Sequence, residues 1–391
     1  MFPKGEMLSN FMQDAKILAG IVSRRVLTGP HSVQISIVDA CNYRCIMCWE
    51  HSSELNGLGA DPIARDYHEN KKYKKTVMDL KVFKSLITSL ASSGTGHISL
   101  AGIGEPLMHK HIVEAIAFAR ENGIKVWLTT NGSRLNQDIM KELAACGLED
   151  INVSINAGNA AEYSLVHSNQ NNSMYDQIID HLVWFKGYKH ERGLTQPQLT
   201  LSNVVCNLNY HRSVEMMRAG IATGARNVFY RPIDVYEQTR DFALSDAHLD
   251  ELRSSFAACE DLADRHGIQT NISMFEKLLA LRDTQTIPAP CFAGWVAPFV
   301  LANGDVTFCC LSREVLGNLS ESSFGDIWFS SSRRSLNETA LRMHKTQEAV
   351  PNSRCLGCEQ SFQNLKVNRF LWPLLGKSKA SGTAAAMRRA V

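Results

Sequence analysis

The chain has 391 residues, which is enough for one large domain with a smaller one, or for two domains of medium size. A hydrophobic share of 45% allows a sizeable core and excludes a wholly disordered chain. The net charge of +2 gives no sign of nucleic-acid binding, and no run of about 18 apolar residues predicts an integral membrane segment. Because the first residues, MFPKGEMLSN, lack an apolar signal segment, we expect a cytoplasmic protein.

The apolar pattern predicts strands and helices in alternation after a helical N-terminal segment, residues 1–31. Such βα units build a parallel sheet, so we predict an α/β fold with a partial (β/α)6 TIM-like barrel over residues 32–285. In such barrels the chemistry lies at the C-terminal ends of the strands. The expected strands are 32–38, 97–101, 124–130, 151–155, 198–205, 227–233 and a short one at 268–272, and the expected helices are 111–122, 135–146, 159–191, 210–222 and 246–265.

Three stretches depart from this alternation. Residues 50–76 are polar without an apolar period, and a cover over an active site and a plain surface loop are both open interpretations. After Pro288 the pattern changes to short strands and turns, including a hairpin around Asn303-Gly304. This change predicts a small α+β domain over residues 286–376. Residues 377–391 are small and basic and predict a flexible tail.

Eight of the eleven cysteines fall into two groups, and a reducing compartment favours metal ligands over disulfides. Cys41, Cys45 and Cys48 form a C-x3-C-x2-C loop directly after the first strand. Three thiolates on one loop can hold a [4Fe–4S] cluster with one iron left open, whereas structural zinc requires four closed ligands. The loop therefore indicates an iron–sulfur site at the mouth of the barrel.

This loop, placed after the first strand of a βα barrel, resembles that of the radical S-adenosylmethionine (radical SAM) superfamily. The resemblance implies that the open iron binds SAM. It also implies that reductive cleavage of SAM yields a 5′-deoxyadenosyl radical, which abstracts a hydrogen atom from the substrate. Within the loop, Tyr43 and Met47 are implied cofactor contacts, with Met47 toward the adenine.

Further motifs follow the next strands in the order that the resemblance requires. The sequence Gly102-Ile103-Gly104-Glu105-Pro106 resembles the GGEP motif that holds the SAM amino group, with Ile103 as a departure. Three more groups of residues complete the comparison. Thr130-Asn131-Gly132 resembles the TNG element near the ribose, Ser154 and Asn156 are implied ribose and carboxylate contacts, and His167 and Asn169 lie where the family often has an arginine for the SAM carboxylate. Each such turn also occurs in proteins without this site.

The second group of cysteines lies in the C-terminal domain. Cys291, Cys309 in a G-x4-C hairpin, and the C-x2-C pair Cys355 and Cys358 suit zinc or an iron–sulfur cluster. This stretch resembles the SPASM/twitch extension of radical SAM enzymes. Because no cysteine follows Cys358, the twitch form with one auxiliary [4Fe–4S] cluster matches better. Cys310 should point to the opposite face of its strand from Cys309, and exchanged roles for these two remain open.

The resemblance implies an enzyme whose electrons come from a donor such as flavodoxin or ferredoxin. The form with one auxiliary cluster includes an aminocyclitol dehydrogenase, so we expect oxidation of an alcohol in a non-peptide, carbohydrate- or aminocyclitol-like small molecule. A peptide-modifying enzyme of the RiPP maturase kind is the alternative. Such enzymes often carry an N-terminal peptide-recognition domain, whereas only about 31 residues precede the first strand here, which favours the non-peptide substrate. A binding module without enzymatic activity is the remaining class, against which the series of SAM motifs argues.

Two residues after later strands are the candidate catalytic groups. Cys206 directly follows strand 198–205, where its thiol could return a hydrogen atom to a substrate radical, as an epimerase requires. A buried thiol that only packs is the alternative interpretation. Arg231 ends the next strand and could bind the substrate or form a plain salt bridge.

Overall fold

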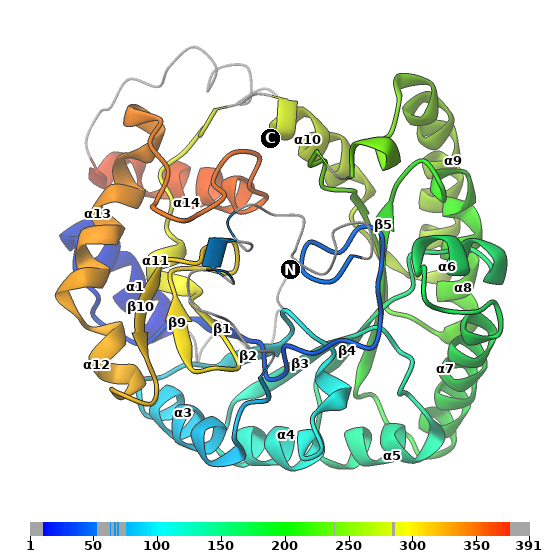
Figure 1. Ribbon diagram of the computed structural model, residues 1–391, viewed down its shortest axis with the longest axis horizontal. Helices are drawn as coiled ribbons and strands as arrows, with labels where there is room; N and C mark the ends of the chain where they lie inside the picture. The colour runs from blue at the N-terminus through cyan, green and yellow to red at the C-terminus, as the bar shows by residue number, and fades with distance from the viewer. Residues whose placement is uncertain are drawn as a thin grey trace.

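The computed structural model describes residues 11–52, 63, 66–67, 69, 76–237, 239–283 and 286–375. In this part of the chain the centre is one sheet of ten strands, in the order β10-β9-β8-β1-β2-β3-β4-β5-β6-β7 (Figure 1). The strands are β1 Ser32–Ile35, β2 His97–Leu100, β3 Lys125–Thr130, β4 Asp150–Ser154, β5 Gln198–Val205, β6 Asn227–Pro232, β7 Gln269–Thr270, β8 Phe299–Val300, β9 Asp305–Thr307 and β10 Val315–Asn318.

Helices follow the strands of the barrel and form an arc outside them (Figure 1). Within the described residues, none of them combines the length and the apolar character that crossing a bilayer requires. The helices are α1 Phe11–Ser23, α3 Leu80–Ser92, α4 Ile112–Glu121, α5 Gln137–Ala145, α6 Ala160–Val166, α7 Ser173–Glu191, α8 Ser213–Thr223, α9 Asp246–His266, α10 Ile272–Asp283, α11 Ala293–Val296, α12 Phe324–Trp328, α13 Ser331–Thr346 and α14 Gln360–Leu375, with short 3-10 helices at Pro106–Met108, Tyr210–Arg212 and Arg240–Phe242.

The predicted parallel barrel is confirmed. Strands β1 to β7 pair with their neighbours in parallel, from Val33 opposite Ile98 to Val228 opposite Thr270. Their buried side chains, such as Ile35 and Leu128, form the main core with the inner faces of the helices. Parallel pairing directs the C-terminal ends of β1 to β7 toward the same side, where the predicted motifs lie.

Several elements differ from the prediction, which also lacked helices α10, α13 and α14. The range 159–191, expected to be mostly helix, divides into α6 and α7 with a break at residues 167–172. Helix α3 was not predicted, although Asp79 caps it by accepting a hydrogen bond from the Lys81 N–H. Most of the polar segment 50–76 and the whole tail 377–391 lie outside the described residues, so those two expectations stay untested.

The C-terminal part shares the sheet of the barrel. Strand β8 pairs in parallel with β1, with Gln34 opposite Phe299, and the predicted hairpin then adds β9 and β10 in antiparallel pairing. Gly304 occupies the turn with a φ of 89°, a conformation that favours glycine. The expected boundary near residue 286 is therefore a change of topology within one sheet.

Helix α1 packs on the C-terminal part, close to α11 and α14 (Figure 1). The apolar face of α1 supplies Ile17 and Ile21, which pack with Phe292, Trp295 and Leu371 in one cluster. The N-terminal and C-terminal parts of the described chain therefore share a small core of their own beside the barrel.

We predict that Ile21→Ala lowers the free energy of unfolding by about 2–5 kcal/mol, because it leaves a cavity in this shared core. Ile21 is 1% exposed. The control is Met12→Ala in the same helix, whose side chain is 67% exposed and whose loss should cost less than about 0.5 kcal/mol. Urea unfolding of both variants measures the difference, and equal losses would contradict the packing described.

Candidate functional site

The three cysteines of the N-terminal loop lie together just beyond β1, and each is half-buried. Burial, followed by the neighbouring thiols of Cys48 and Cys41, raises the pKa of Cys45 well above its usual value. Burial also raises the pKa of Cys48 to about 12. Three thiols this close oppose one another's ionisation, so they become thiolates most readily when a cation binds them.

The three thiols are close enough to one another to suit a multi-iron cluster. Cys45 interacts electrostatically with Cys48 and Cys41, and Cys48 with Cys41. Three neighbouring thiolates suit three corners of a [4Fe–4S] cube, with the fourth corner left for another ligand.

The break between α6 and α7 holds the cysteine loop in place. The Ser168 hydroxyl donates to the Arg44 carbonyl at 2.7 Å. The Asn169 side chain donates to the Asn42 carbonyl at 2.9 Å and accepts the Arg44 N–H at 2.8 Å. The side chains of Ser168 and Asn169 thus satisfy backbone groups of the cysteine loop that have no partner within the loop.

His167, in the same break, contacts a cysteine directly. Its Nδ1 lies 3.0 Å from Cys45 Sγ, and its Nε2 lies 3.2 Å from the carbonyl oxygen of Ile155. Because a carbonyl only accepts, Nε2 carries the hydrogen, and Nδ1 faces the sulfur. Burial lowers the pKa of His167 to about 4. The structure therefore places both His167 and Asn169 against the cysteine loop.

The loop after β2 lies flat on the backbone that leads to the cysteines. A Cβ on Gly104 would come within 2.2 Å of the Ala40 carbonyl oxygen, and one on Gly102 within 2.6 Å of Ser36 Cβ. Gly104 N–H donates to the Val38 carbonyl at 3.0 Å. These glycines permit a close approach of two backbones that any side chain would prevent.

Glu105 links this loop to the predicted motif after β3. Its carboxylate is 2% exposed and accepts hydrogen bonds from the Thr130 hydroxyl at 2.7 Å, the Asn131 N–H at 2.8 Å and the Leu107 N–H at 3.0 Å. Burial raises the pKa of Glu105 above its usual value. Pro106 then begins a 3-10 helix at its N-terminal position. Two motifs that are distant in sequence thus form one surface.

Asn131 connects that surface to the cysteine loop. Its Nδ2 donates to Asn42 Oδ1 at 2.9 Å and lies 3.9 Å from Cys41 Sγ. Its Oδ1 accepts from the Ser133 hydroxyl at 2.7 Å, which fixes the orientation of the amide. The predicted contacts at the ends of the first three strands are therefore joined in one hydrogen-bonded network.

The remaining predicted cofactor contacts are partly engaged within the protein. Ser154 is half-buried at the end of β4, and the side chain of Asn156 accepts the Val204 N–H at 2.8 Å. Tyr43 is 1% exposed, and its hydroxyl lies 2.7 Å from that of Tyr163. Their direct contact with a cofactor stays a prediction.

Met47 and Cys206 pack in one small apolar cluster behind the cysteine loop, together with Ile46, Val166 and Ile233. Cys206 is fully buried, and burial raises the pKa of its thiol to about 11. A cavity of about 540 Å³ lies at the end of β6, and Cys206 is not among the residues that line it. This location favours the packing interpretation of Cys206 over that of a hydrogen donor.

The second group of cysteines also assembles in the fold. Cys309 interacts electrostatically with Cys310, Cys291 and Cys358, and Cys358 interacts also with Cys355. All five line one small cavity. Burial raises the pKa of Cys310 to about 11, with the charges of Glu359, Arg231 and Arg313 acting next. Cys309 packs on one apolar cluster with Cys291 and Cys355, whereas Cys310 packs on another with Phe299 and Leu301. Cys309 is therefore the better candidate for the fourth ligand.

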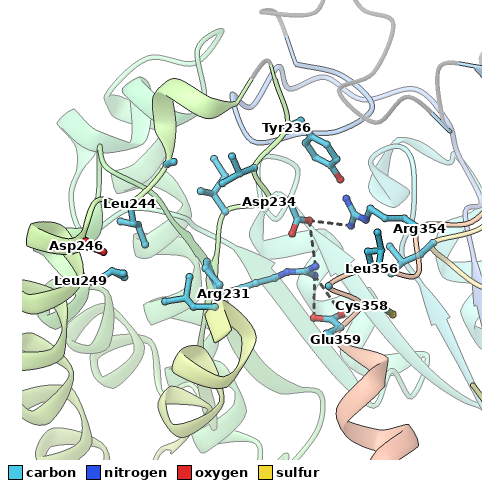
Figure 2. A pocket seen from close by; sticks show the side chains of 17 residues that line it. Arg231, Asp234, Tyr236, Leu244, Asp246, Leu249, Arg354, Leu356, Cys358 and Glu359 are labelled. Carbon is cyan, nitrogen blue, oxygen red and sulfur yellow. Dashed lines mark hydrogen bonds and ion pairs between the residues drawn. The ribbon is translucent and has the colours of Figure 1, made fainter. Parts of the chain in front are cut away.

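A cavity of about 540 Å³ lies between the end of β6 and the second cysteine group (Figure 2). Arg231 lies 3.5 Å from Glu359 and 3.5 Å from Asp234, and Arg354 lies 3.3 Å from the same Asp234. Cys358 also lines the cavity, so the cavity extends to the second cysteine group. The sequence pointed to Arg231 from its place after a strand, but Arg354 and Glu359, which flank the C-x2-C pair, were missed.

We predict that Gly104→Ala removes the ordered cysteine loop, because its methyl group would collide with the Ala40 carbonyl. The free energy of unfolding should fall by about 1–3 kcal/mol and the bound iron should fall with it. Gly187→Ala is the control, since nothing lies within 4 Å of its Cβ in α7 and the change should stabilise that helix by about 0.5–1 kcal/mol. Iron content and urea unfolding are the measurements; full iron in Gly104→Ala would contradict this role.

Comparison with known families agrees with this geometry. The family model of the Radical SAM superfamily matches residues 35–195, and that of the SPASM iron-sulfur cluster-binding domain matches residues 291–359. The two matches contain the first and second cysteine groups, respectively. Both [4Fe–4S] and SAM are thereby cofactors of this chain, and its C-terminal part implies auxiliary iron–sulfur binding.

Individual relatives cover different shares of the chain. The PqqA peptide cyclase of Xanthomonas campestris pv. campestris is 25% identical over 306 residues, which are 76% of this chain and 73% of the relative. The GTP 3',8-cyclase of Actinobacillus pleuropneumoniae is 30% identical over 136 residues, which are 34% of this chain and 35% of the relative.

Streptococcus suis SuiB, solved with S-adenosylmethionine bound, superposes with a TM-score of 0.60 at 15% identity, over 85% of this chain and 73% of that one. This likeness shows a shared fold, which agrees with the partial barrel and C-terminal part described above. The chain therefore carries a radical SAM domain, matched at residues 35–195, and a SPASM domain, matched at residues 291–359.

Proposed function

We propose that this chain abstracts a hydrogen atom from a peptide side chain bound in the cavity between the barrel and the SPASM domain. Cys41, Cys45 and Cys48 would hold the [4Fe–4S] cluster that binds SAM, and Cys291, Cys309, Cys355 and Cys358 would hold one auxiliary cluster. When bound, the first cluster supplies the electron that cleaves SAM and so provides the abstracting radical. The electron source would be a reduced flavodoxin or ferredoxin.

The observation that carries the peptide assignment is the extent of one similarity. The PqqA peptide cyclase matches over 76% of this chain. The GTP 3',8-cyclase matches over only 34%. The cavity is lined by two parts of the chain that are distant in sequence, so a relative that is similar over most of the chain is the better guide to what enters it.

The cavity offers both charges and apolar surface to such a substrate. Arg231 and Arg354 can donate hydrogen bonds to peptide carbonyls, and Asp234 and Glu359 can accept them from peptide N–H groups (Figure 2). Apolar side chains, including Leu356, which is 46% exposed, line the rest. Arg231 has the role of a binding residue in this proposal.

Two other features of the SAM site follow from the contacts of this chain. Glu105 and Thr130 hold the loops after β2 and β3 together, and the Gly104 N–H ties the first of these loops to the backbone that leads to the cysteines. His167 and Asn169 fix the loop itself, which keeps the open iron in a constant position. These residues orient the cofactor and need not change during turnover.

Oxidation of an alcohol in a carbohydrate- or aminocyclitol-like molecule is the second candidate function. The four charged groups Arg231, Asp234, Arg354 and Glu359 favour it, because charged side chains bind hydroxyl groups well. In this case a carboxylate of the cavity would accept the hydroxyl proton as the carbon loses its hydrogen atom.

One experiment separates the two functions. The reconstituted enzyme is incubated with SAM, a reductant and either deuterated peptides or deuterated sugars and aminocyclitols. Deuterium in 5′-deoxyadenosine, measured by mass spectrometry, identifies the substrate class. Transfer from peptides supports the main proposal, whereas transfer from the alcohols alone overturns it in favour of the second.

We predict that the triple change of Cys41, Cys45 and Cys48 to Ala leaves about four of about eight irons per chain and abolishes formation of 5′-deoxyadenosine. Cys146→Ala is the control and should keep all the iron, because this thiol only donates to the Leu143 carbonyl at the end of α5. Metal analysis and product chromatography are the measurements. Zinc in place of iron in the triple variant would overturn the auxiliary-cluster assignment.

We predict that Cys206→Ala retains product formation and loses only about 1 kcal/mol of stability, because its thiol is buried among apolar side chains. Turnover in deuterated water checks the alternative. If the enzyme epimerises with Cys206 as donor, the wild-type product gains one solvent deuterium and the variant stalls after hydrogen abstraction. Either observation would contradict the packing role.

A further inference from the structure

A buried ion pair joins the two cysteine-bearing parts of the chain. Glu50, two residues after Cys48, accepts a hydrogen bond from Arg313 at 2.5 Å, and their side chains are 1% and 5% exposed. The same guanidinium donates to the carbonyls of Ser312 at 3.1 Å and Cys310 at 3.4 Å. One arginine therefore contacts both the segment after the SAM-cluster loop and the backbone beside Cys309.

A second contact joins the same two parts. The guanidinium carbon of Arg354, the residue before Cys355, lies 5.1 Å from the centre of the Trp49 ring, within the range of a cation–π interaction. It lies 5.2 Å from the Tyr236 ring as well, and it pairs with Asp234 at 3.3 Å. Trp49 directly follows Cys48, so residues adjacent to two cluster ligands are in contact.

The two arginines belong to one rigid unit of the SPASM domain. The Arg313 N–H donates to the Asn352 carbonyl at 2.8 Å, and the Arg354 N–H donates to the Leu311 carbonyl at 2.9 Å. The Ser353 and Ser312 hydroxyls are 2.7 Å apart between them. Because the backbones of both segments are paired, their side chains reach the dipeptide 49–50 with a fixed spacing.

We propose that Trp49, Glu50, Arg313 and Arg354 form an inter-cluster clamp, which fixes the auxiliary-cluster loops against the SAM-cluster loop and so sets the distance between the two clusters. A buried ion pair is directional and costly to leave half-made, so it holds one geometry rather than many. The four members are positioning residues: they act on the loops that carry the ligands. The proposal rests on the ligand assignment above and not on the identity of the substrate.

The test measures the cluster distance directly and uses no substrate. The holoenzyme is reduced with dithionite, and the magnetic dipolar coupling between the two clusters is recorded by pulsed electron paramagnetic resonance. In Glu50→Gln the side chain is neutral, so the buried charge of Arg313 loses its carboxylate partner. We therefore expect a broadened distance distribution and loss of the resolved coupling. Glu276→Gln is the matched control, because its ion pair with Arg253 is exposed and touches neither cluster loop.

Two further variants keep the proposal falsifiable if Glu50→Gln fails to hold its clusters. Arg354→Lys retains the positive charge beside Asp234 but loses the planar contact with Trp49, and it should broaden the distance distribution with full iron content. The exchange Glu50→Arg with Arg313→Glu should restore part of the coupling. An unchanged coupling in Arg354→Lys, or in a fully loaded Glu50→Gln protein, would overturn the clamp.

The outcomes also distinguish this proposal from the proposed function. A change of substrate class would leave the coupling and its response to the clamp variants unaltered. A failed ligand assignment would instead appear as missing iron in the wild-type protein. A clamp that is wrong would leave normal iron and normal coupling in Arg354→Lys or in Glu50→Gln.

Discussion

The pairing of β8 with β1 is the constraint on which the rest of this structure depends. Strand β1 leads into the SAM-cluster loop, and β8 begins the hairpin that carries Cys309. With Gln34 opposite Phe299 and Ile35 opposite Val300, the SPASM strands continue the sheet of the barrel. The two cysteine groups are thereby parts of one backbone framework, and the Glu50–Arg313 ion pair joins them again at side-chain level.

Both cysteine groups combine burial with mutual repulsion. Burial is the largest contribution to the raised pKa of Cys45 and Cys309, and neighbouring thiols add to it. The protein alone therefore holds these thiols in a state that opposes their ionisation, and binding a cluster relieves that opposition. The hydrogen bonds from Ser168 and Asn169 hold the backbone of the cysteine loop in place.

The cavity at the end of β6 is lined by both cysteine-bearing parts of the chain. It is lined by the barrel on one side and by the segment of the C-x2-C pair on the other, and Arg231 and Arg354 reach the same Asp234 from the two sides. A substrate in this cavity would contact both the part that binds SAM and the part that binds the auxiliary cluster. A cavity at the junction of two parts, with a few charged groups among apolar side chains, is typical of ligand sites.

The sequence by itself determined the alternation of strands and helices, the two cysteine groups and the motifs after the second and third strands. Each of these is a local pattern of spacing or periodicity, and a turn such as Asn303-Gly304 carries its reason within a few residues. Helix α3 was missed although its local signals, the Asp79 cap and a buried apolar face, are present.

Only the tertiary structure decided how these pieces meet. The break between α6 and α7 became the support of the cysteine loop through contacts such as that of His167 with Cys45, which are 122 residues apart. Glu50 and Arg313 are 263 residues apart, and Cys206 was placed behind the loop by packing with Ile233. No local pattern encodes such pairings, because they depend on which faces become adjacent once β8 and β2 have paired with the two edges of β1.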